Sequence, residues 1–345
     1  MPTRNIKDFT LKELEEILED MGERRYRARQ IFFWVYRKGA HDFSEMKNLP
    51  AALIEKLRKN YNAGPLETAR HFKSADGTEK ILFRLPGPCF IETVLVRAEG
   101  RKTVCISTQV GCKYGCLFCA SGKNGFTRNL AVSEIIGQIL HFRKDPSGGI
   151  TNYVFMGMGE PLDNYDNLIK AIKIMNDKSG MAIGARRITV STCGLIPPIE
   201  KLQNAGLQVN LSVSLHAADN KLRERLMPVN SIYPLEKLTT ACKKFIDKTR
   251  REITLEYVMI KNLNISAKNA DSLGVLAKAL DAKINLIHYS PIQGVHFEPA
   301  GKADAAAFMS SLRKKKLKVT LRESKGGDIN AACGQLSGNL YTDKH

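Results

Sequence analysis

From Thr103 onward the chain alternates between short apolar runs and longer stretches with helical periodicity, and this alternation constrains the fold more than any other feature. Such alternation is typical of repeated βα units around a parallel sheet. Because six or seven strands are fewer than the eight of a closed barrel, we predict an α/β fold with an open, partial (βα)6 barrel. The apolar runs are 104–107, 153–156, 188–191, 209–215, 253–259, 284–288 and 319–321.

Polar, glycine-rich or cysteine-rich residues lie at the predicted strand ends. In folds of this class the ligand binds at the carboxyl ends of the strands, on the loops that follow. Each segment alone is as compatible with a turn or a core residue as with a site. Their occurrence on one rim predicts a binding site there. The segments are 111–119, 156–161, 191–194 and 214–216, with Asn285 inside the sixth strand.

The loop after the first strand holds Cys112, Cys116 and Cys119 in the spacing C-x3-C-x2-C. Three thiolates on one loop leave a fourth coordination position open. Soft thiolates select zinc, copper(I) or iron–sulfur clusters, and a 4Fe-4S cluster held by three cysteines has one iron free to bind a substrate or cofactor. A structural zinc site usually adds a second pair of ligands, and no second cysteine pair follows Cys119. The spacing therefore favours the cluster, with zinc as the alternative.

Eight cysteines in 345 residues are too few for a disulfide-stapled scaffold. The first residues lack the apolar core of a signal peptide, and no apolar stretch approaches the roughly 18 residues that a membrane span needs. We expect a cytoplasmic, reduced protein that does not associate with membranes.

The net charge of +18 favours a polyanionic partner, with nucleic acid preferred over an acidic membrane surface. Arginines cluster at 24–29, beside several aromatic residues.

A capping box at Thr10–Glu13 predicts a helix from Leu11, and two more helices are expected at 26–38 and after Pro50. The expected organisation is a helical RNA-binding unit at 1–62, a β linker with a hairpin at 63–100, and the barrel with a catalytic cysteine loop at 101–345.

Five motifs make the chain resemble, over nearly its whole length, a family of radical S-adenosylmethionine (SAM) methyltransferases. This family, the RlmN and Cfr group, modifies an adenine of 23S ribosomal RNA. The motifs are CISTQVGC (105–112), FMGMGEP (155–161), SLH (214–216), EYVM (256–259) and DINAACGQL (328–336).

The resemblance implies a radical SAM barrel with a 4Fe-4S cluster on Cys112, Cys116 and Cys119. The fourth iron of the cluster would bind the amino and carboxylate groups of SAM. The protein's task would be to orient the radical and exclude water. By resemblance, the residues that bind SAM are Gly159, Glu160, Ser191, Ser214, Leu215, His216 and Asn285.

The resemblance also implies a covalent mechanism that uses two SAM molecules per turnover. Cys333 would receive a methyl group from the first SAM, and the radical from the second would activate that methyl for addition to the adenine. Cys105 would then release the RNA by forming a disulfide with Cys333. Glu92 matches the position of the base that removes the ring proton. Cys89, Cys193 and Cys242 match no role, although Cys193 lies close to the cofactor rim.

The family splits by target atom. Val110 and Pro161 stand where the resistance branch, which methylates carbon 8, tends to carry cysteine and alanine. Carbon 2 of the adenine is therefore favoured, as in the housekeeping branch, which also methylates a tRNA adenine beside the anticodon. A monomer served by a flavodoxin-type electron donor is expected. The alternatives are the carbon-8 enzyme, a radical SAM activase or sulfur-inserting enzyme, and a zinc-stabilised RNA-binding protein.

Overall fold

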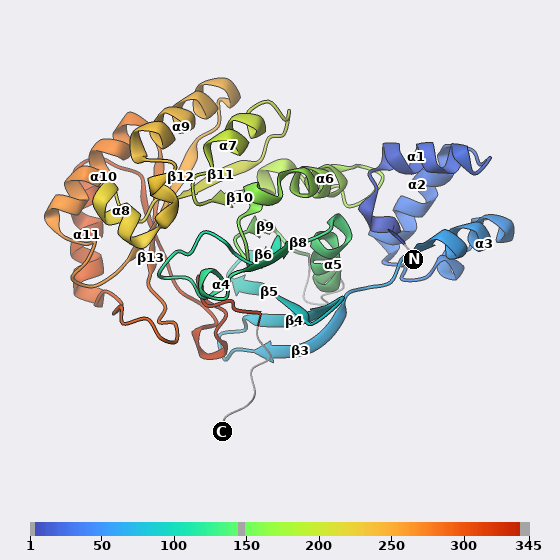
Figure 1. The fold of residues 1–345 in the computed structure, drawn as a ribbon, viewed down its shortest axis with the longest axis horizontal. Helices are drawn as coiled ribbons and strands as arrows, with labels where there is room; N and C mark the ends of the chain where they lie inside the picture. Colours follow the sequence, from blue (N-terminus) through green and yellow to red (C-terminus); the bar gives the residue numbers. More distant parts are fainter. Residues whose placement is uncertain (1–3, 144–148, 339–345) are drawn as a thin grey trace.

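The computed structural model describes residues 4–143 and 149–338. Its centre is a ten-stranded sheet in the order β14-β13-β12-β11-β10-β9-β6-β5-β4-β3 (Figure 1). The strands from β6 through β9 to β14 run parallel to one another. They span Arg101–Cys105 (β6), Asn152–Phe155 (β9), Ile188–Thr192 (β10), Asn210–Ser214 (β11), Ile253–Met259 (β12), Lys283–His288 (β13) and Val319–Arg322 (β14).

Helices connect these strands in six successive βα units, and β14 adds a seventh parallel strand after the last helix. The predicted partial (βα)6 barrel is confirmed. No helix in the described ranges combines the length and apolar character of a membrane span. The connecting helices are α4 (Ala120–Lys123), α5 (Val132–Arg143), α6 (Tyr165–Asn176), α7 (Ile196–Leu202), α8 (Asn220–Leu226), α9 (Leu235–Thr249), α10 (Ala267–Ala279) and α11 (Lys302–Lys314).

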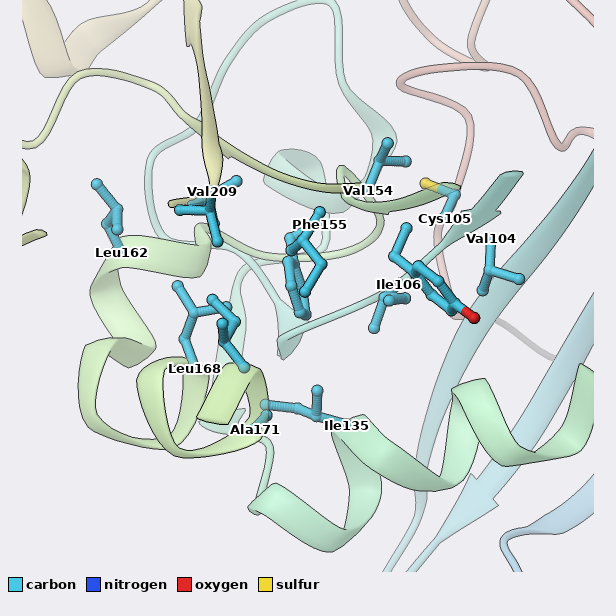
Figure 2. Close-up of a cluster of buried hydrophobic side chains, with 14 of the residues drawn as sticks. Val104, Cys105, Ile106, Ile135, Val154, Phe155, Leu162, Leu168, Ala171 and Val209 are labelled. Atoms are coloured by element: carbon cyan, nitrogen blue, oxygen red, sulfur yellow. The ribbon is translucent and has the colours of Figure 1, made fainter. Parts of the chain in front are cut away.

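An apolar core fixes the sheet against its helices. Figure 2 shows this core around Ile106, Ile135, Phe155 and Leu168, all of which are fully buried. Parallel strands covered on both faces carry nearly continuous apolar runs, and β9 has this pattern, because Tyr153, Val154 and Phe155 are all buried. The core therefore gives a rigid base to the loops that follow β6 and β9.

Three antiparallel strands extend the sheet beyond β6: β5 (Cys89–Ala98), β4 (Glu79–Leu85) and β3 (Glu67–Lys73). The hairpin predicted at 80–85 and 91–97 corresponds to β4 and β5. The edge strand β3 was not predicted, because it is largely exposed and its polar sequence lacks apolar alternation. A separate antiparallel pair, β7 (Gln109–Gly111) and β8 (Phe126–Asn129), flanks the cysteine loop.

The N-terminal residues form the expected helices, α1 (Leu11–Asp20), α2 (Tyr26–Phe32) with a π-helical continuation Phe33–Lys38, and α3 (Ala51–Asn60). The capping box of Thr10 and Glu13 is present. These helices pack beside the barrel helices α5 and α6 (Figure 1). Lys170 of α6 forms an ion pair of 2.7 Å with Glu13, so the two parts are directly joined.

Candidate functional site

A cavity of about 160 Å³ lies at the carboxyl ends of the parallel strands. It is lined by residues from the loops after β6 and β9 and from the ends of β10 and β11, as the strand-end pattern predicted. The sequence-predicted residues that line it are Cys112, Cys116, Cys119, Gly159, Glu160, Ser191, Ser214, His216 and Cys333.

The backbone of the cysteine loop is held from several sides. Gly111 has a φ of 73°, and a Cβ there would lie 1.8 Å from the Gly125 carbonyl oxygen, so only glycine fits. The Cys112 N–H donates to the same carbonyl oxygen at 2.8 Å. The Leu117 N–H donates to the Leu226 carbonyl oxygen at 3.0 Å, which ties the loop to α8. These contacts fix the backbone of the loop.

The three thiols suit an iron–sulfur cluster. Burial raises the pKa of Cys112 to about 12, and burial together with the neighbouring thiolates raises the pKa of Cys116. A cavity that gathers thiolates needs a cationic group, which a metal cluster supplies. In residues 4–143 and 149–338, no three His, Cys, Asp or Glu side chains converge on a point where one ion could bind. The three cysteines line one cavity, which suits a cluster whose irons each take one thiolate.

Glu160 places a buried carboxylate in the cavity. Its Oε2 accepts from the Cys193 N–H at 2.7 Å and its Oε1 from the Leu162 N–H at 3.0 Å. Burial raises the pKa of Glu160, while these hydrogen bonds oppose the rise. Gly159 has a φ of 95°, and a Cβ there would lie 2.4 Å from the Gln109 Cβ. The glycine lets the chain turn tightly and bring the carboxylate to the cavity, where it suits an ammonium group.

His216 is neutral in this structure. Its backbone is left-handed, with a φ of 57°, and its Nδ1 accepts from the Val258 N–H at 2.9 Å. Burial, followed by the charge of Arg223, lowers the pKa of His216 to about 3. The ring proton therefore lies on Nε2, which makes His216 a neutral donor at the cavity wall.

Two predicted SAM-binding residues lie outside this cavity. Leu215 is 1% exposed, and its N–H donates to the Glu256 carbonyl oxygen at 3.0 Å. Asn285 donates from Nδ2 to Glu256 Oε2 at 2.6 Å and lines an adjoining polar cavity that Glu256 also borders. Glu256 lines the main cavity as well, so Asn285 is connected to the main cavity only through its hydrogen bond to Glu256.

A smaller cavity of about 80 Å³ is lined by both Cys105 and Cys333. Cys333 lines the larger cavity too, so it stands between the cysteine loop and Cys105. Burial, followed by the charge of Cys333, raises the pKa of Cys105 to about 12. The Cys105 thiol is therefore protonated at neutral pH in this structure.

Arg322 lines both cavities and was not predicted from the sequence. Its Nη1 lies 3.9 Å from Met156 Sδ. Cys333 and Cys105 both contribute to raising the pKa of Arg322. Arg322 is the last residue of β14, so the strand-end pattern would have found it had it been applied to the last strand.

The segment that carries Cys333 packs against the cysteine loop. The Ala120 N–H donates to the Gly334 carbonyl oxygen at 2.7 Å, and Ser121 Oγ donates to the Leu336 carbonyl oxygen at 2.6 Å. A Cβ on Gly334 would lie 2.8 Å from the Phe118 carbonyl oxygen. These contacts hold the segment that carries Cys333 in place.

Glu92 lines neither of these two cavities. It is fully buried, and its Oε1 lies 2.8 Å from Lys80 Nζ. Its Oε2 accepts from the N–H groups of Ser337 at 2.7 Å and Gly338 at 2.9 Å. The carboxylate is thus covered by the residues that follow Cys333.

Two family models match the chain. Residues 106–271 match the radical SAM superfamily. Residues 4–62 match the ribosomal RNA large subunit methyltransferase N-terminal domain. The first range contains the cysteine loop and the ends of β9, β10, β11 and β12 at the larger cavity, and the second contains the N-terminal helices.

Curated relatives match nearly the whole chain. The dual-specificity RNA methyltransferase RlmN of Nautilia profundicola is 44% identical over 336 residues, covering 93% of this chain and 95% of that protein. The probable dual-specificity RNA methyltransferase RlmN of Clostridium novyi is 41% identical, covering 97% of this chain and 98% of that protein. The crystal structure of a radical SAM methyltransferase from Sphaerobacter thermophilus has a TM-score of 0.94 at 42% identity, covering 97% of this chain and 100% of that one.

Proposed function

The chain belongs to the RlmN family of radical SAM RNA methyltransferases, and from that premise we propose that it methylates carbon 2 of an adenine in 23S rRNA and of a tRNA adenine beside the anticodon. Family membership excludes the zinc-stabilised binding protein and the activase or sulfur-inserting enzyme. The position of Cys333 is the main support for this proposal. Cys333 lines both the cavity of the cysteine loop and the cavity of Cys105, as a methyl carrier that serves two partners requires.

The radical SAM superfamily uses a 4Fe-4S cluster and SAM. We propose that Cys112, Cys116 and Cys119 hold the cluster, which when bound supplies the electron that converts SAM into a carbon radical. Glu160 would accept from the SAM amino group, which its buried position in the cavity supports. The other SAM contacts would come from Gly159, Ser191, Ser214, His216 and the Leu215 backbone, with Asn285 acting through Glu256.

The methyl carrier would be Cys333. Its thiolate would take a methyl group from a first SAM, and a second SAM would supply the radical that removes one hydrogen from that methyl. The resulting Cys333 methylene radical would bond to carbon 2 of the adenine. The adduct would then give one electron to the oxidised iron–sulfur cluster and the ring proton to Glu92. Cys105 would then give up its thiol proton and attack the Cys333 sulfur. A disulfide forms, the bond between the Cys333 sulfur and the methylene carbon breaks, and that carbon takes up a proton as the RNA departs.

Glu92 would accept the ring proton. Because both of its oxygens are held in this structure, we propose that Ser337 and Gly338 move away before it does so. Their departure would leave the carboxylate with Lys80 as its partner. It would also open the side of Glu92 that the residues after Cys333 cover.

We propose residues 1–62 as the RNA-binding unit, 63–100 as the β linker and 101–345 as the catalytic barrel. Arg24, Arg25 and Arg29 are exposed on the first unit, which supports a role in binding phosphates. Arg25 is paired with Glu19 and Arg29 lies 4.0 Å from Glu15, so phosphates would replace these exposed surface partners. Arg27 is engaged within the protein, because its Nη1 donates to the Asn48 carbonyl oxygen at 3.1 Å.

From the family resemblance we also propose a cytoplasmic monomer with a flavodoxin-type electron donor.

Nucleoside analysis tests the proposed function. The protein, reconstituted anaerobically with iron and sulfide, is incubated with SAM, a reductant and a 23S rRNA fragment or tRNA. Digested RNA is then examined by mass spectrometry against 2-methyladenosine and 8-methyladenosine standards. We expect 2-methyladenosine. The 8-methyl isomer would assign the chain to the resistance branch, and methylation of neither RNA by a cluster-loaded protein would contradict the proposal.

A further inference from the structure

Arg223 is a fully buried arginine without an acidic partner. Its side chain is 0% exposed, and no Asp or Glu in the described ranges forms an ion pair with it. Nη1 donates to Asn230 Oδ1 at 2.9 Å, and Nη2 donates to the Cys193 carbonyl oxygen at 2.7 Å. Nε has no hydrogen-bond partner. The guanidinium is thus held by neutral groups only.

A buried charge that nothing neutralises is costly for a protein. Arginine does not avoid this cost by losing its proton, because its pKa stays far above neutral. Burial lowers the pKa of Arg223, whereas the thiols of Cys193 and Cys116 act to raise it. The position of Arg223 therefore suits an anionic group that binds on the side of the guanidinium near Cys193 and Cys116.

Arg223 lies directly behind the wall of the larger cavity. The residues whose carbonyl oxygens accept from its Nη2, Cys193 and Ser214, both line that cavity. Arg223 itself does not line it. Its helix, α8, also accepts the Leu117 N–H of the cysteine loop through the Leu226 carbonyl oxygen. The helix that carries the Arg223 guanidinium is therefore joined to the loop that would hold the cluster. Because Arg223 does not line the cavity, it would not contact SAM directly.

We propose that Arg223 is a positioning residue that acts through the iron–sulfur cluster, and that its buried charge raises the cluster's reduction potential. The inference rests on the proposed function, because it assumes a cluster on the three cysteines. Three thiolates make a 4Fe-4S cluster anionic, and reduction adds one more negative charge. A fixed cation in a medium of low dielectric stabilises the reduced form more than the oxidised form. Arg223 would thus ease reduction of the cluster by the electron donor, the step that precedes SAM cleavage.

Asn230→Asp tests the charge while leaving the guanidinium in place. Asn230 is 2% exposed, and aspartate has nearly the same shape, so its carboxylate would pair with Arg223 and neutralise it. The substitution also removes two longer hydrogen bonds from Nδ2 to Asn220, at 3.2 and 3.1 Å. The measurement is the midpoint potential of the reconstituted cluster, followed by electron paramagnetic resonance. We expect reduction to become about tenfold less favourable, which is about 59 mV for one electron.

Three further variants separate charge from structure. Arg223→Gln should lower the potential by a similar amount, whereas Arg223→Lys, which keeps the charge, should stay within about threefold of the wild-type equilibrium. Asn204→Asp adds the same charge at an exposed site and should leave the potential unchanged. Thermal unfolding of each protein checks the fold.

Equal potentials in wild type, Asn230→Asp and Arg223→Gln would overturn the inference. If Asn230→Asp does not fold, the comparison of Arg223→Gln with Arg223→Lys decides in the same way. Loss of the fold in both neutralising variants would also overturn it, because the charge effect would then be inseparable from structure. A wild-type protein that binds no cluster would instead contradict the proposed function.

Discussion

Lys80 and Glu92 form an ion pair of 2.8 Å in which the two side chains are 1% and 0% exposed. They lie on adjacent antiparallel strands, β4 and β5, as diagonal neighbours, because Leu82 is the residue opposite Glu92. Lys80 Nζ also donates to the Asn330 carbonyl oxygen at 3.2 Å, and Glu92 accepts from Ser337. The pair therefore holds the chain on both sides of Cys333.

Lys80→Met should destabilise the protein strongly. It leaves Glu92 buried without its cation, and breaking a buried pair by removing one partner costs about 3–5 kcal/mol. Chemical denaturation of the cluster-free protein measures the free energy of unfolding. The double variant Lys80→Met/Glu92→Gln should recover part of the loss, because it leaves no unpaired charge. A single variant within about 1 kcal/mol of wild type would contradict the buried-pair interpretation.

Glu92→Gln should separate methyl transfer to Cys333 from methylation of the RNA. Methyl transfer to Cys333 needs no base on the RNA, so mass spectrometry of the Cys333 peptide should still find the methyl group. RNA methylation should fall by about 100-fold or more, the usual contribution of a general base. If RNA methylation stays near the wild-type rate, another group removes the ring proton.

Cys116→Ala should fold but retain neither iron nor SAM-cleaving activity, because each thiolate supplies one of three protein bonds to the cluster. Iron and sulfide content after anaerobic purification measures this. Cys242→Ala is the matched control, since Cys242 is buried in α9, away from the cavity, and it should retain its iron. Wild-type iron content in Cys116→Ala would contradict the assignment of the cysteine loop.

Replacing Arg24, Arg25 and Arg29 with Gln should weaken RNA binding and flatten its salt dependence by roughly one unit of slope for each lost phosphate contact. Cleavage of SAM should be unaffected. Arg27→Gln, whose arginine is bonded to Asn48, is the control and should change the slope little. An unchanged slope in the triple variant would mean that these arginines only keep the surface solvated.

The strands and the cysteine cavity were predictable because their signals are local. A strand such as Ile253–Met259 is a short, mostly apolar run, interrupted only by Thr254 and Glu256, and the strand-end rule places Ser214 and Glu160 at one rim. The sequence does not reveal contacts such as that of Lys80 with Asn330, which are 250 positions apart. Such contacts depend on how the antiparallel extension packs against the segment that carries Cys333. For the same reason the position of Arg223 became evident only in the structure, whereas the strand-end pattern, applied to β14, would have found Arg322.

In the proposed mechanism Cys333 carries the methyl group to RNA and Cys105 releases it. The most direct measurement is a denaturing gel of Cys105→Ala expressed in cells, with and without nuclease. Because the attacking thiol is missing while both earlier steps remain possible, we expect a slower band that nuclease removes, with the cross-link mapped to Cys333. Cys333→Ala should show no such band. Absence of bound RNA in Cys105→Ala, or a cross-link at any other residue, would contradict the account.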